Sequence, residues 1–270
     1  MADHRDILSR PAPMGVVDRY GDHPDQLIEW FRPTWAVHAT VAVLHGGFWR
    51  AEYDRSHIRP LCHALAGEGY DVAAIEYRRT GDGGGCPSTF DDVATAVSVI
   101  AERLAGGGAP EPLALLGHSA GGQLALWAAA EAGDPTPPRS RRGRRLRRCR
   151  IAGVVALAAV SDLIACHRLD LDGGAVTDLL GGSPSDRAEC YAEFDPAVRT
   201  PAGNPVLVHG DADRQVPVTM SRTFAADRGA EYHELAGMDH YGLIDPMSHA
   251  WPVVRRAAAT ATGVPAAPRS

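Results

Sequence analysis

The segment that most restricts how this chain can fold spans residues 113–123 and reads LALLGHSAGGQ. Residues 113–116 form a short apolar run of the length of a buried strand, and the Ala- and Leu-rich residues 124–132 are typical of a helix. Between them, residues 117–121 match the pattern G-x-S-x-G. This spacing predicts that Ser119 lies on a sharp turn from strand to helix, where small neighbours let the two elements approach closely.

A serine in this position has the features of a nucleophile. The helix N-terminus and the N–H group of Ala120 are expected to point at negative charge that develops on a substrate oxygen. The alternative is that Ser119 only caps the helix, because serine is favoured at that position. The flanking strand and helix favour the nucleophile, since the pentapeptide then has the structural context that this chemistry requires.

The rest of the chain alternates between apolar strand patterns and amphipathic helix patterns. Two early segments, 15–20 and 27–31, are expected to form an antiparallel pair. Strands are then predicted at 37–44, 70–77, 113–116, 151–159, 205–209 and 230–235, and helices at 55–68, 89–104, 124–132, 218–228 and 251–262. This alternation predicts an α/β fold, in which helices cover both faces of a mostly parallel sheet. We expect a single domain over residues 1–270.

Three segments do not follow this alternation of strands and helices. Residues 1–14 are polar and are expected to form a loose arm. Residues 134–150 contain three Pro and eight Arg and are expected to be a solvated, Arg-rich loop, because like charges repel one another. A nucleic-acid patch is the alternative, but the net charge of −6 gives no support for it. Residues 162–201, with short helices expected at 169–180 and 185–194, are a candidate helical lid over the site.

Two further groups that a nucleophilic serine needs follow the last two predicted strands. The serine requires a base to take its proton and a carboxylate to orient that base. Asp213 follows the strand at 205–209, and His240 follows the strand at 230–235. Parallel strands end at one edge of the sheet, so Ser119, Asp213 and His240 are expected to meet there. For the carboxylate, Asp211 and Asp162 are the alternatives.

The sequence HGGFW, residues 45–49, directly follows another predicted strand. Its glycines allow the backbone to turn back with free N–H groups. The N–H groups of Gly47 and Phe48 are expected to join that of Ala120 in an oxyanion hole. Trp49, Phe48 and His118 are candidate substrate contacts, although Trp49 could equally well pack the loop, and Phe48 could belong to the core.

The amino-acid composition argues against several other classes of function. The five cysteines are widely spaced, so they indicate neither a zinc site nor a disulfide framework, and no metal or organic cofactor is expected. The first residues have no apolar stretch typical of a signal peptide, and no apolar run is long enough for a membrane helix. We therefore expect a cytoplasmic protein without membrane or nucleic-acid partners. The oligomeric state is open, with a homodimer among the options.

These motifs together resemble a known family. HGGFW, GHSAGG, an Asp in the context D-x-x-V-P and a late His resemble the kynurenine formamidase (arylformamidase) and related carboxylesterase branch of the α/β-hydrolase superfamily. The resemblance covers about residues 37–256 and implies the α/β-hydrolase fold. Many formamidases have Tyr where Phe48 stands, so the role of that hydroxyl is absent here. The Arg-rich segment is a second departure.

The predicted activity is serine-dependent hydrolysis of a carboxylic ester or an aryl formamide. Ser119 would attack the carbonyl, His240 would accept its proton, and Asp213 would orient the imidazole. An acyl-enzyme would then be hydrolysed by water. The D-x-x-V-P pattern is also similar to that of prolyl-oligopeptidase relatives, so a peptidase or acylaminoacyl hydrolase is an alternative. A non-catalytic ligand-binding protein with the same fold is another.

Overall fold

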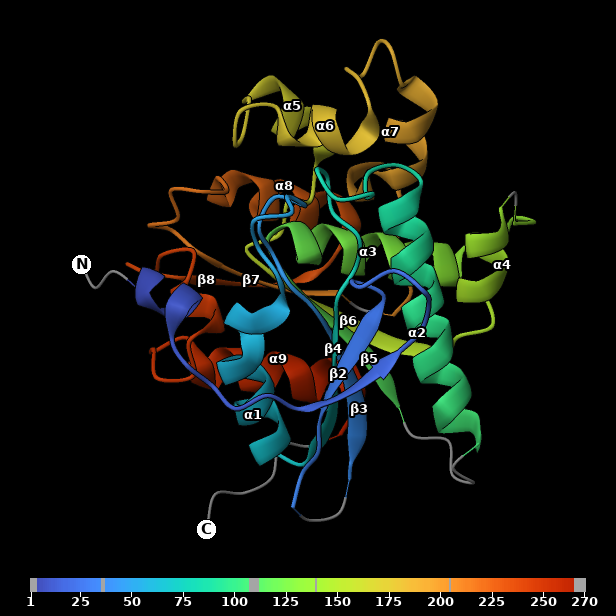
Figure 1. Ribbon diagram of the computed structural model, residues 1–270. Helices are drawn as coiled ribbons and strands as arrows, with labels where there is room; N and C mark the ends of the chain where they lie inside the picture. The colour runs from blue at the N-terminus through green and yellow to red at the C-terminus, as the bar shows by residue number, and fades with distance from the viewer. Residues whose placement is uncertain (1–3, 35–36, 107–111, 139, 204, 265–270) are drawn as a thin grey trace.

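A central sheet organises the molecule. The structure, a computed structural model, describes residues 4–34, 37–106, 112–138, 140–203 and 205–264. In this part of the chain, eight strands form one sheet in the order β1-β2-β4-β3-β5-β6-β7-β8 (Figure 1). The strands are β1 (Val16–Arg19), β2 (Leu27–Phe31), β3 (Ala39–Leu44), β4 (Tyr70–Ile75), β5 (Leu113–His118), β6 (Ile151–Leu157), β7 (Pro205–Gly210) and β8 (Glu231–Leu235).

The sheet is mixed but mostly parallel, as predicted. The expected early pair, β1 and β2, is antiparallel, and β2 also runs antiparallel to β4. From β4 across to β8 all neighbouring strands are parallel. Strands β3, β4, β5 and β7 are buried along their whole length, because helices cover both faces of the sheet and each strand therefore reads as an apolar run.

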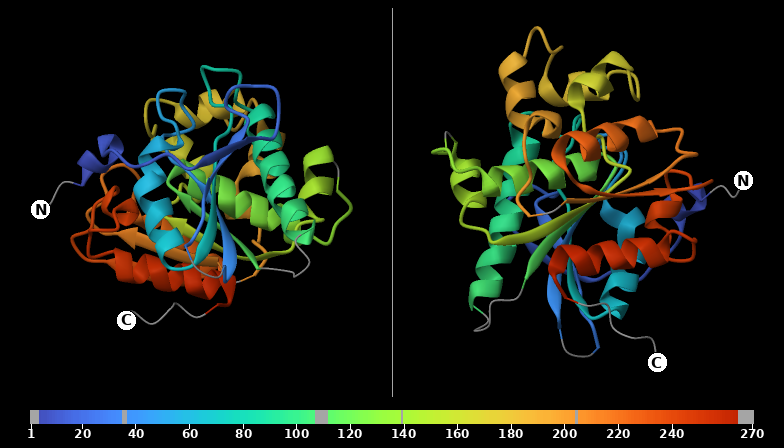
Figure 2. Two further views of the ribbon diagram at one scale, coloured as in Figure 1. Left: turned by 60° about the horizontal axis from the view of Figure 1, so that its bottom comes forward. Right: turned by 180° about the vertical axis from the view of Figure 1, so that it is seen from behind.

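Helices pack on both sides and divide the core in two. Helices α1 (Arg59–Gly67) and α9 (Trp251–Thr262) cover one face, and α2 (Ser88–Gly106), α3 (Ala120–Gly133) and α8 (Val218–Arg228) cover the other. Figure 2 shows α9, in red, across the sheet from α3 and α8. Each face carries its own cluster of buried apolar side chains. The carboxyl ends of the parallel strands therefore share one edge, between two well-packed layers.

The Arg-rich segment is partly the solvated loop that its charge suggests, since Arg141, Arg144, Arg145, Arg148 and Arg150 are exposed. However, helix α4 (Arg141–Leu146) lies within it and packs on α2 and α3, and Leu146 is fully buried. Arg142 bonds to Glu193 and Asp91, so carboxylates from other elements neutralise its charge. The helix was not predicted because those partners are distant in sequence. Position 139, in the same segment, lies outside the described residues.

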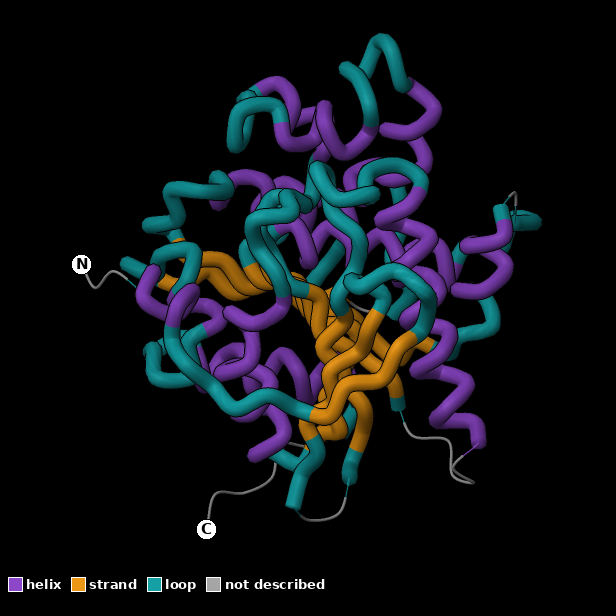
Figure 3. Tube along the Cα trace, viewed as in Figure 1, coloured by secondary structure: helices purple, strands orange, loops and turns teal. Residues whose placement is uncertain are grey.

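Residues 162–201 form a helical segment between β6 and β7. It contains α5 (Leu163–Arg168), α6 (Ala175–Leu180), α7 (Ala188–Phe194) and the short 3₁₀ helix η3 (Pro196–Val198). These helices lie above α3 and α8 in Figure 1, and Figure 3 shows the loops that join them. The second predicted helix matches α7, whereas the first begins later than expected, and α5 was missed. That the segment acts as a lid stays a prediction.

The N-terminal segment is not a loose arm. A 3₁₀ helix, η1 (Arg5–Ser9), buries Ile7 completely. The two Nη atoms of Arg10 donate to the Asp245 carboxylate at 2.7 and 3.0 Å. The segment is therefore fastened to the loop that follows β8.

Candidate active site

Ser119 lies on the turn between β5 and α3, which we call the elbow, in a strained conformation. Its φ and ψ angles are 56° and −121°, a backbone conformation that residues other than glycine rarely adopt. The Ser119 side chain makes no capping hydrogen bond to α3, so the structure does not favour the alternative that it serves only as a helix cap. A Cβ atom on Gly121 would overlap with the carbonyl oxygens of Leu44 and His45. Glycine is therefore required where α3 begins against the end of β3.

The loop after β3 lies against this turn. Gly47, Phe48 and Trp49 have φ angles of 107°, 46° and 58°, so the backbone makes an unusual left-handed turn here. A Cβ atom on Gly46 would come within 2.9 Å of Ser119 Cβ, which shows how closely the two loops approach. Within the described part of the chain, the N–H groups of Gly47, Phe48 and Ala120 donate no hydrogen bond. They have the character of oxyanion-hole donors.

Asp213 and His240 form a close, buried pair. The distance from His240 Nδ1 to Asp213 Oδ2 is 2.6 Å, and both side chains are almost completely buried. The other oxygen, Asp213 Oδ1, accepts hydrogen bonds from the backbone N–H groups of Gln215 and Val216. Burial alone would raise the pKa of Asp213, but the bonds from His209 and His240 outweigh it and bring the pKa well below its usual range. Asp213 is therefore a carboxylate held against the imidazole.

Ser119 and His240 line one cavity, and the loop at 46–49 contributes to its wall. The cavity has a volume of about 50 Å³. Gly47 and Phe48 line it as well, together with Leu8, Tyr53, His57, His118, Asp172, Gln215 and Tyr241. The structure thus brings together the serine, the imidazole and the predicted oxyanion loop, although they come from segments far apart in sequence.

The three predicted substrate contacts differ in position. Phe48 and His118 line the cavity. Trp49 does not belong to its lining: the indole is fully buried in the core and donates its Nε1–H to Gln123 Oε1 at 3.2 Å. Trp49 therefore packs the loop, which corrects its assignment as a substrate contact. The reason is that the core buries this large apolar ring, while Gln123 satisfies the indole N–H group, which needs a partner when buried.

The carboxylate alternatives lie elsewhere. Asp211 Oδ1 accepts a hydrogen bond from the N–H of Gly237, and Asp162 caps α5 by accepting one from Ala165 N–H. Each of these side chains thus stabilises a local turn or helix end. Asp213 is the member of this group that contacts His240.

Sequence reasoning gave no role to His209 and His57, which the structure places beside the site. His209 is fully buried, and its Nε2 lies 3.1 Å from both Asp213 Oδ2 and the Val216 carbonyl oxygen. Both partners are acceptors, so Nε2 carries a proton and donates to Asp213. The signal for this was the position of His209 at the end of a strand, four residues before the aspartate. His57 lines the cavity, and its burial, with the nearby charge of His45, lowers its pKa to about 4.

The described residues contain no group of three or more His, Cys, Asp or Glu side chains that could hold a metal ion. In the same ranges, none of the helices combines the length and the apolar character that crossing a membrane requires.

Comparison with known proteins places the chain in a family. The BD-FAE family model matches residues 33–227, which is more than half of the chain and includes the elbow and Asp213. The chain therefore belongs to the BD-FAE family. A curated relative, the probable carboxylic ester hydrolase LipM of Mycobacterium tuberculosis, is 28% identical over 218 residues. The alignment covers 76% of this chain but 49% of LipM, so the chain spans about half the length of that relative.

Solved structures show that this BD-FAE member has the α/β-hydrolase fold that its motifs predicted. A truncated carbohydrate esterase from gut microbiota superposes with a TM-score of 0.75 at 18% identity, covering 93% of this chain and 97% of the other. The apo form of Thermogutta terrifontis esterase 2 gives a TM-score of 0.72 at 19% identity, with 97% and 99% coverage. At these identities the likeness concerns the fold.

Proposed function

We propose that this protein is a serine hydrolase that cleaves carboxylic esters with short acyl groups. The observation that carries the proposal is that a strained Ser119, the imidazole of His240 and the donor loop at Gly47 and Phe48 line one cavity, while Asp213 holds that imidazole from behind. This set supplies each part that acyl transfer needs: a nucleophile, an oriented base and donors for the oxyanion. The BD-FAE match and the relative described as an ester hydrolase point to the same bond.

The proposed reaction proceeds in two halves. Ser119 Oγ attacks the ester carbonyl while His240 Nε2 takes its proton, and Asp213 stabilises the imidazolium. The N–H groups of Gly47, Phe48 and Ala120 bind the oxyanion, and the alcohol leaves with the proton from His240. Water, activated by His240, then cleaves the acyl-enzyme by the same steps.

The size of the cavity favours small acyl groups. About 50 Å³ beside Ser119 leaves room for only a few heavy atoms. The indole of Trp49 fills the core behind the loop and so does not extend the space. Thermogutta terrifontis esterase 2, which shares the fold at 20% identity, has a structure with propionate bound.

The direct test compares the wild-type protein with Ser119→Ala on p-nitrophenyl acetate, butyrate and octanoate. We expect Ser119→Ala to lower kcat by about 10⁴-fold or more, since loss of the nucleophile removes the covalent route. The matched control is Ser185→Ala, an exposed serine in the segment after β6, which is expected to leave kcat unchanged. Acetate and butyrate should be cleaved faster than octanoate.

The same experiment tests the formamidase and peptidase alternatives. For these, N-formylkynurenine and a short acylated peptide are offered beside the esters. Faster cleavage of either one would replace the ester as the substrate class. Equal rates for wild type and Ser119→Ala on every substrate would overturn the hydrolase proposal and favour a ligand-binding protein.

A further inference from the structure

His45, the first residue of the HGGFW loop, makes polar contacts through both of its ring nitrogens. Nδ1 lies 2.8 Å from the Gly46 carbonyl oxygen, and Nε2 lies 2.8 Å from Glu76 Oε1. The side chain is fully buried, so water does not take part in either contact. The mechanism above gives this residue no role, although it stands next to the proposed oxyanion donors.

The partners of His45 fix its protonation state. A carbonyl oxygen only accepts hydrogen bonds, so the contact with Gly46 requires a proton on Nδ1. Burial would raise the pKa of Glu76, but His45 and Arg79 outweigh it and lower that pKa, so Glu76 is a carboxylate. The contact with Glu76 therefore requires a proton on Nε2 as well. An imidazole that donates from both nitrogens is a cation.

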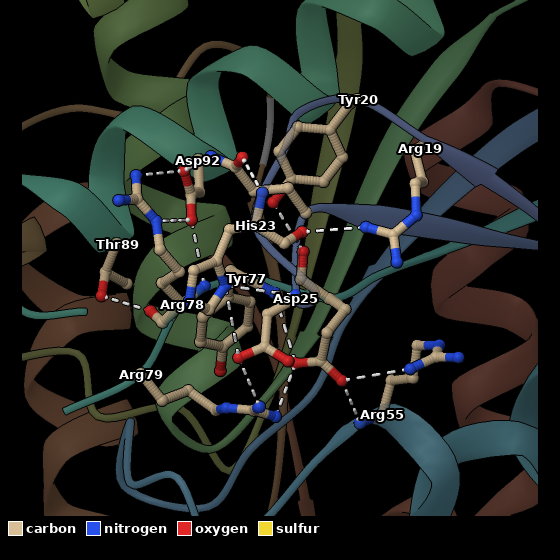
Figure 4. Close-up of polar contacts among 12 residues, drawn as sticks. Arg19, Tyr20, His23, Asp25, Arg55, Tyr77, Arg78, Arg79, Thr89 and Asp92 are labelled. Atoms are coloured by element: carbon tan, nitrogen blue, oxygen red, sulfur yellow. Dashed lines mark hydrogen bonds and ion pairs between the residues drawn. The ribbon is translucent and has the colours of Figure 1, made fainter. Parts of the chain in front are cut away.

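The contact of His45 with Glu76 is part of a buried network of charged groups. Glu76 also accepts hydrogen bonds from Arg79 Nη1 at 2.7 Å and from the Arg55 N–H at 2.9 Å, and Asp25 pairs with Arg79 at 2.9 Å. Figure 4 shows the side chains of Asp25, Arg55 and Arg79 near one another. The Tyr77 ring stacks on the His45 ring with centroids 4.5 Å apart. The remaining titratable neighbours are His57, whose ring centroid is 5.7 Å away, and Asp54, whose pKa is lowered in part by the charge of His45.

The hydrogen bond to Gly46 has a consequence for the next residue. In a trans peptide the C=O and N–H bonds point in opposite directions. Since the Gly46 carbonyl is held toward the His45 ring, the N–H of Gly47 must point the other way. Gly47 lines the cavity that contains Ser119, and its N–H donates no hydrogen bond within the described residues.

We propose that His45 is a positioning residue whose imidazolium holds the Gly46–Gly47 peptide so that Gly47 N–H faces the oxyanion. This inference rests on the proposed hydrolase function. Without a donor at Nδ1, nothing holds the Gly46 carbonyl, and the peptide is free to turn its Gly47 N–H away from the oxyanion.

Two substitutions separate the two contacts of His45. The amide nitrogen of Asn occupies nearly the place of Nδ1, so His45→Asn keeps the donor to Gly46 and loses the one to Glu76. The amide nitrogen of Gln occupies nearly the place of Nε2, so His45→Gln does the opposite. Neither amide titrates. We expect His45→Gln to lower kcat by about 10²–10³-fold at unchanged KM, the effect of losing one oxyanion donor.

In contrast, His45→Asn should keep kcat within about tenfold of wild type. The opposite ranking would show that the Glu76 contact alone matters and would overturn the proposal. Thermal unfolding of both variants identifies any loss of fold.

A further measurement uses the wild-type protein and needs no assay of catalysis, so it remains possible if a variant does not fold. Long-range ¹⁵N–¹H spectra of the histidine-labelled wild-type protein report whether a ring carries one proton or two. The contact with Gly46 requires a proton on His45 Nδ1, and a ring without a proton on that nitrogen would overturn the inference. If wild type and Ser119→Ala were equally inactive, the proposed function would fail while this spectrum would still test the charge on His45.

Discussion

Most of the strained backbone conformations in the described residues lie at or near the proposed active site. Of the described residues other than glycine, those with positive φ are Phe48, Trp49, Ser119, Ala158, Asp170 and Asp172. The first four directly follow parallel strands or lie a few residues beyond their ends, and Asp172 lines the cavity. Each such conformation costs about 1–3 kcal/mol, so the surrounding packing must hold it in place. Phe48, Trp49, Ser119 and Ala158 are all buried, so the core around them can hold these four conformations.

The contact between Asp213 and His240 gives a prediction for the carboxylate. Asp213→Asn keeps the shape of the side chain but removes the charge that stabilises the imidazolium. We expect kcat to fall by about 10⁴-fold on p-nitrophenyl acetate. The matched control is Asp211→Asn, the rival two residues earlier, which bonds to Gly237 and should change kcat little. If Asp211→Asn lost more kcat than Asp213→Asn, Asp211 and not Asp213 would be the carboxylate that orients His240.

The lowered pKa of Asp213 also predicts how stability depends on pH. The unfolded chain protonates this carboxyl near pH 4, whereas the folded protein holds it ionised to lower pH. The stabilisation is therefore present above about pH 4 and is lost as the pH falls toward the folded pKa. Urea unfolding between pH 2 and 6 should show a smaller decline for Asp213→Asn than for wild type. Parallel declines would contradict the assignment.

At the scale of elements, the regular parts followed from local patterns. Apolar runs predicted the buried strands, and the Gly-x-Ser-x-Gly spacing predicted the elbow, because both depend on residues close in sequence. Helix α4 was missed because the carboxylates that pair with its arginines come from other elements. The contact of His209 with Asp213 is local, but the pattern of an apolar strand does not show which way one polar side chain near its end turns. Trp49 was assigned to the cavity because the partner of its indole, Gln123, lies on α3 and not in its own loop.

The elbow requires glycine at position 121, and this gives a second kind of test. Gly121→Ala places a Cβ atom against the carbonyl oxygens of Leu44 and His45, so we expect a loss of stability of about 1–3 kcal/mol and a large loss of activity. Gly67→Ala is the control: this helical glycine has open space around its Cβ position and should gain about 0.4–1 kcal/mol. Chemical denaturation and ester hydrolysis measure both. An active, stable Gly121→Ala would refute the close approach.

At the scale of the whole molecule, the N-terminal segment and the loop after β8 close the site together. The His4 N–H donates to Asp239 Oδ2 at 3.0 Å, Arg10 pairs with Asp245, and Leu8 and His240 line the same cavity. The loop that carries His240 is thus held from outside the sheet. Its position depends on residues more than 200 positions away in sequence.

Removing this connection should reduce both stability and turnover. Arg10→Ala leaves the buried Asp245 carboxylate without its charged partner, so we expect a loss of about 1–3 kcal/mol and a moderate fall in kcat/KM. Arg222→Ala breaks the exposed pair with Glu234 and serves as the control with little effect. Thermal unfolding and ester kinetics distinguish the two. Equal effects would mean that the N-terminal segment does not support the site.

The fastening of residues 4–10 to residues 239–245 has a consequence for biosynthesis. The ribosome makes residues 4–10 before the strands of the sheet and residues 239–245 after them. A nascent chain that ends between these segments can already assemble the elbow and the HGGFW turn, but it lacks the imidazole and one wall of the cavity. The proposed esterase activity should consequently arise only once the polypeptide has grown past residue 245 and its two distant segments have docked.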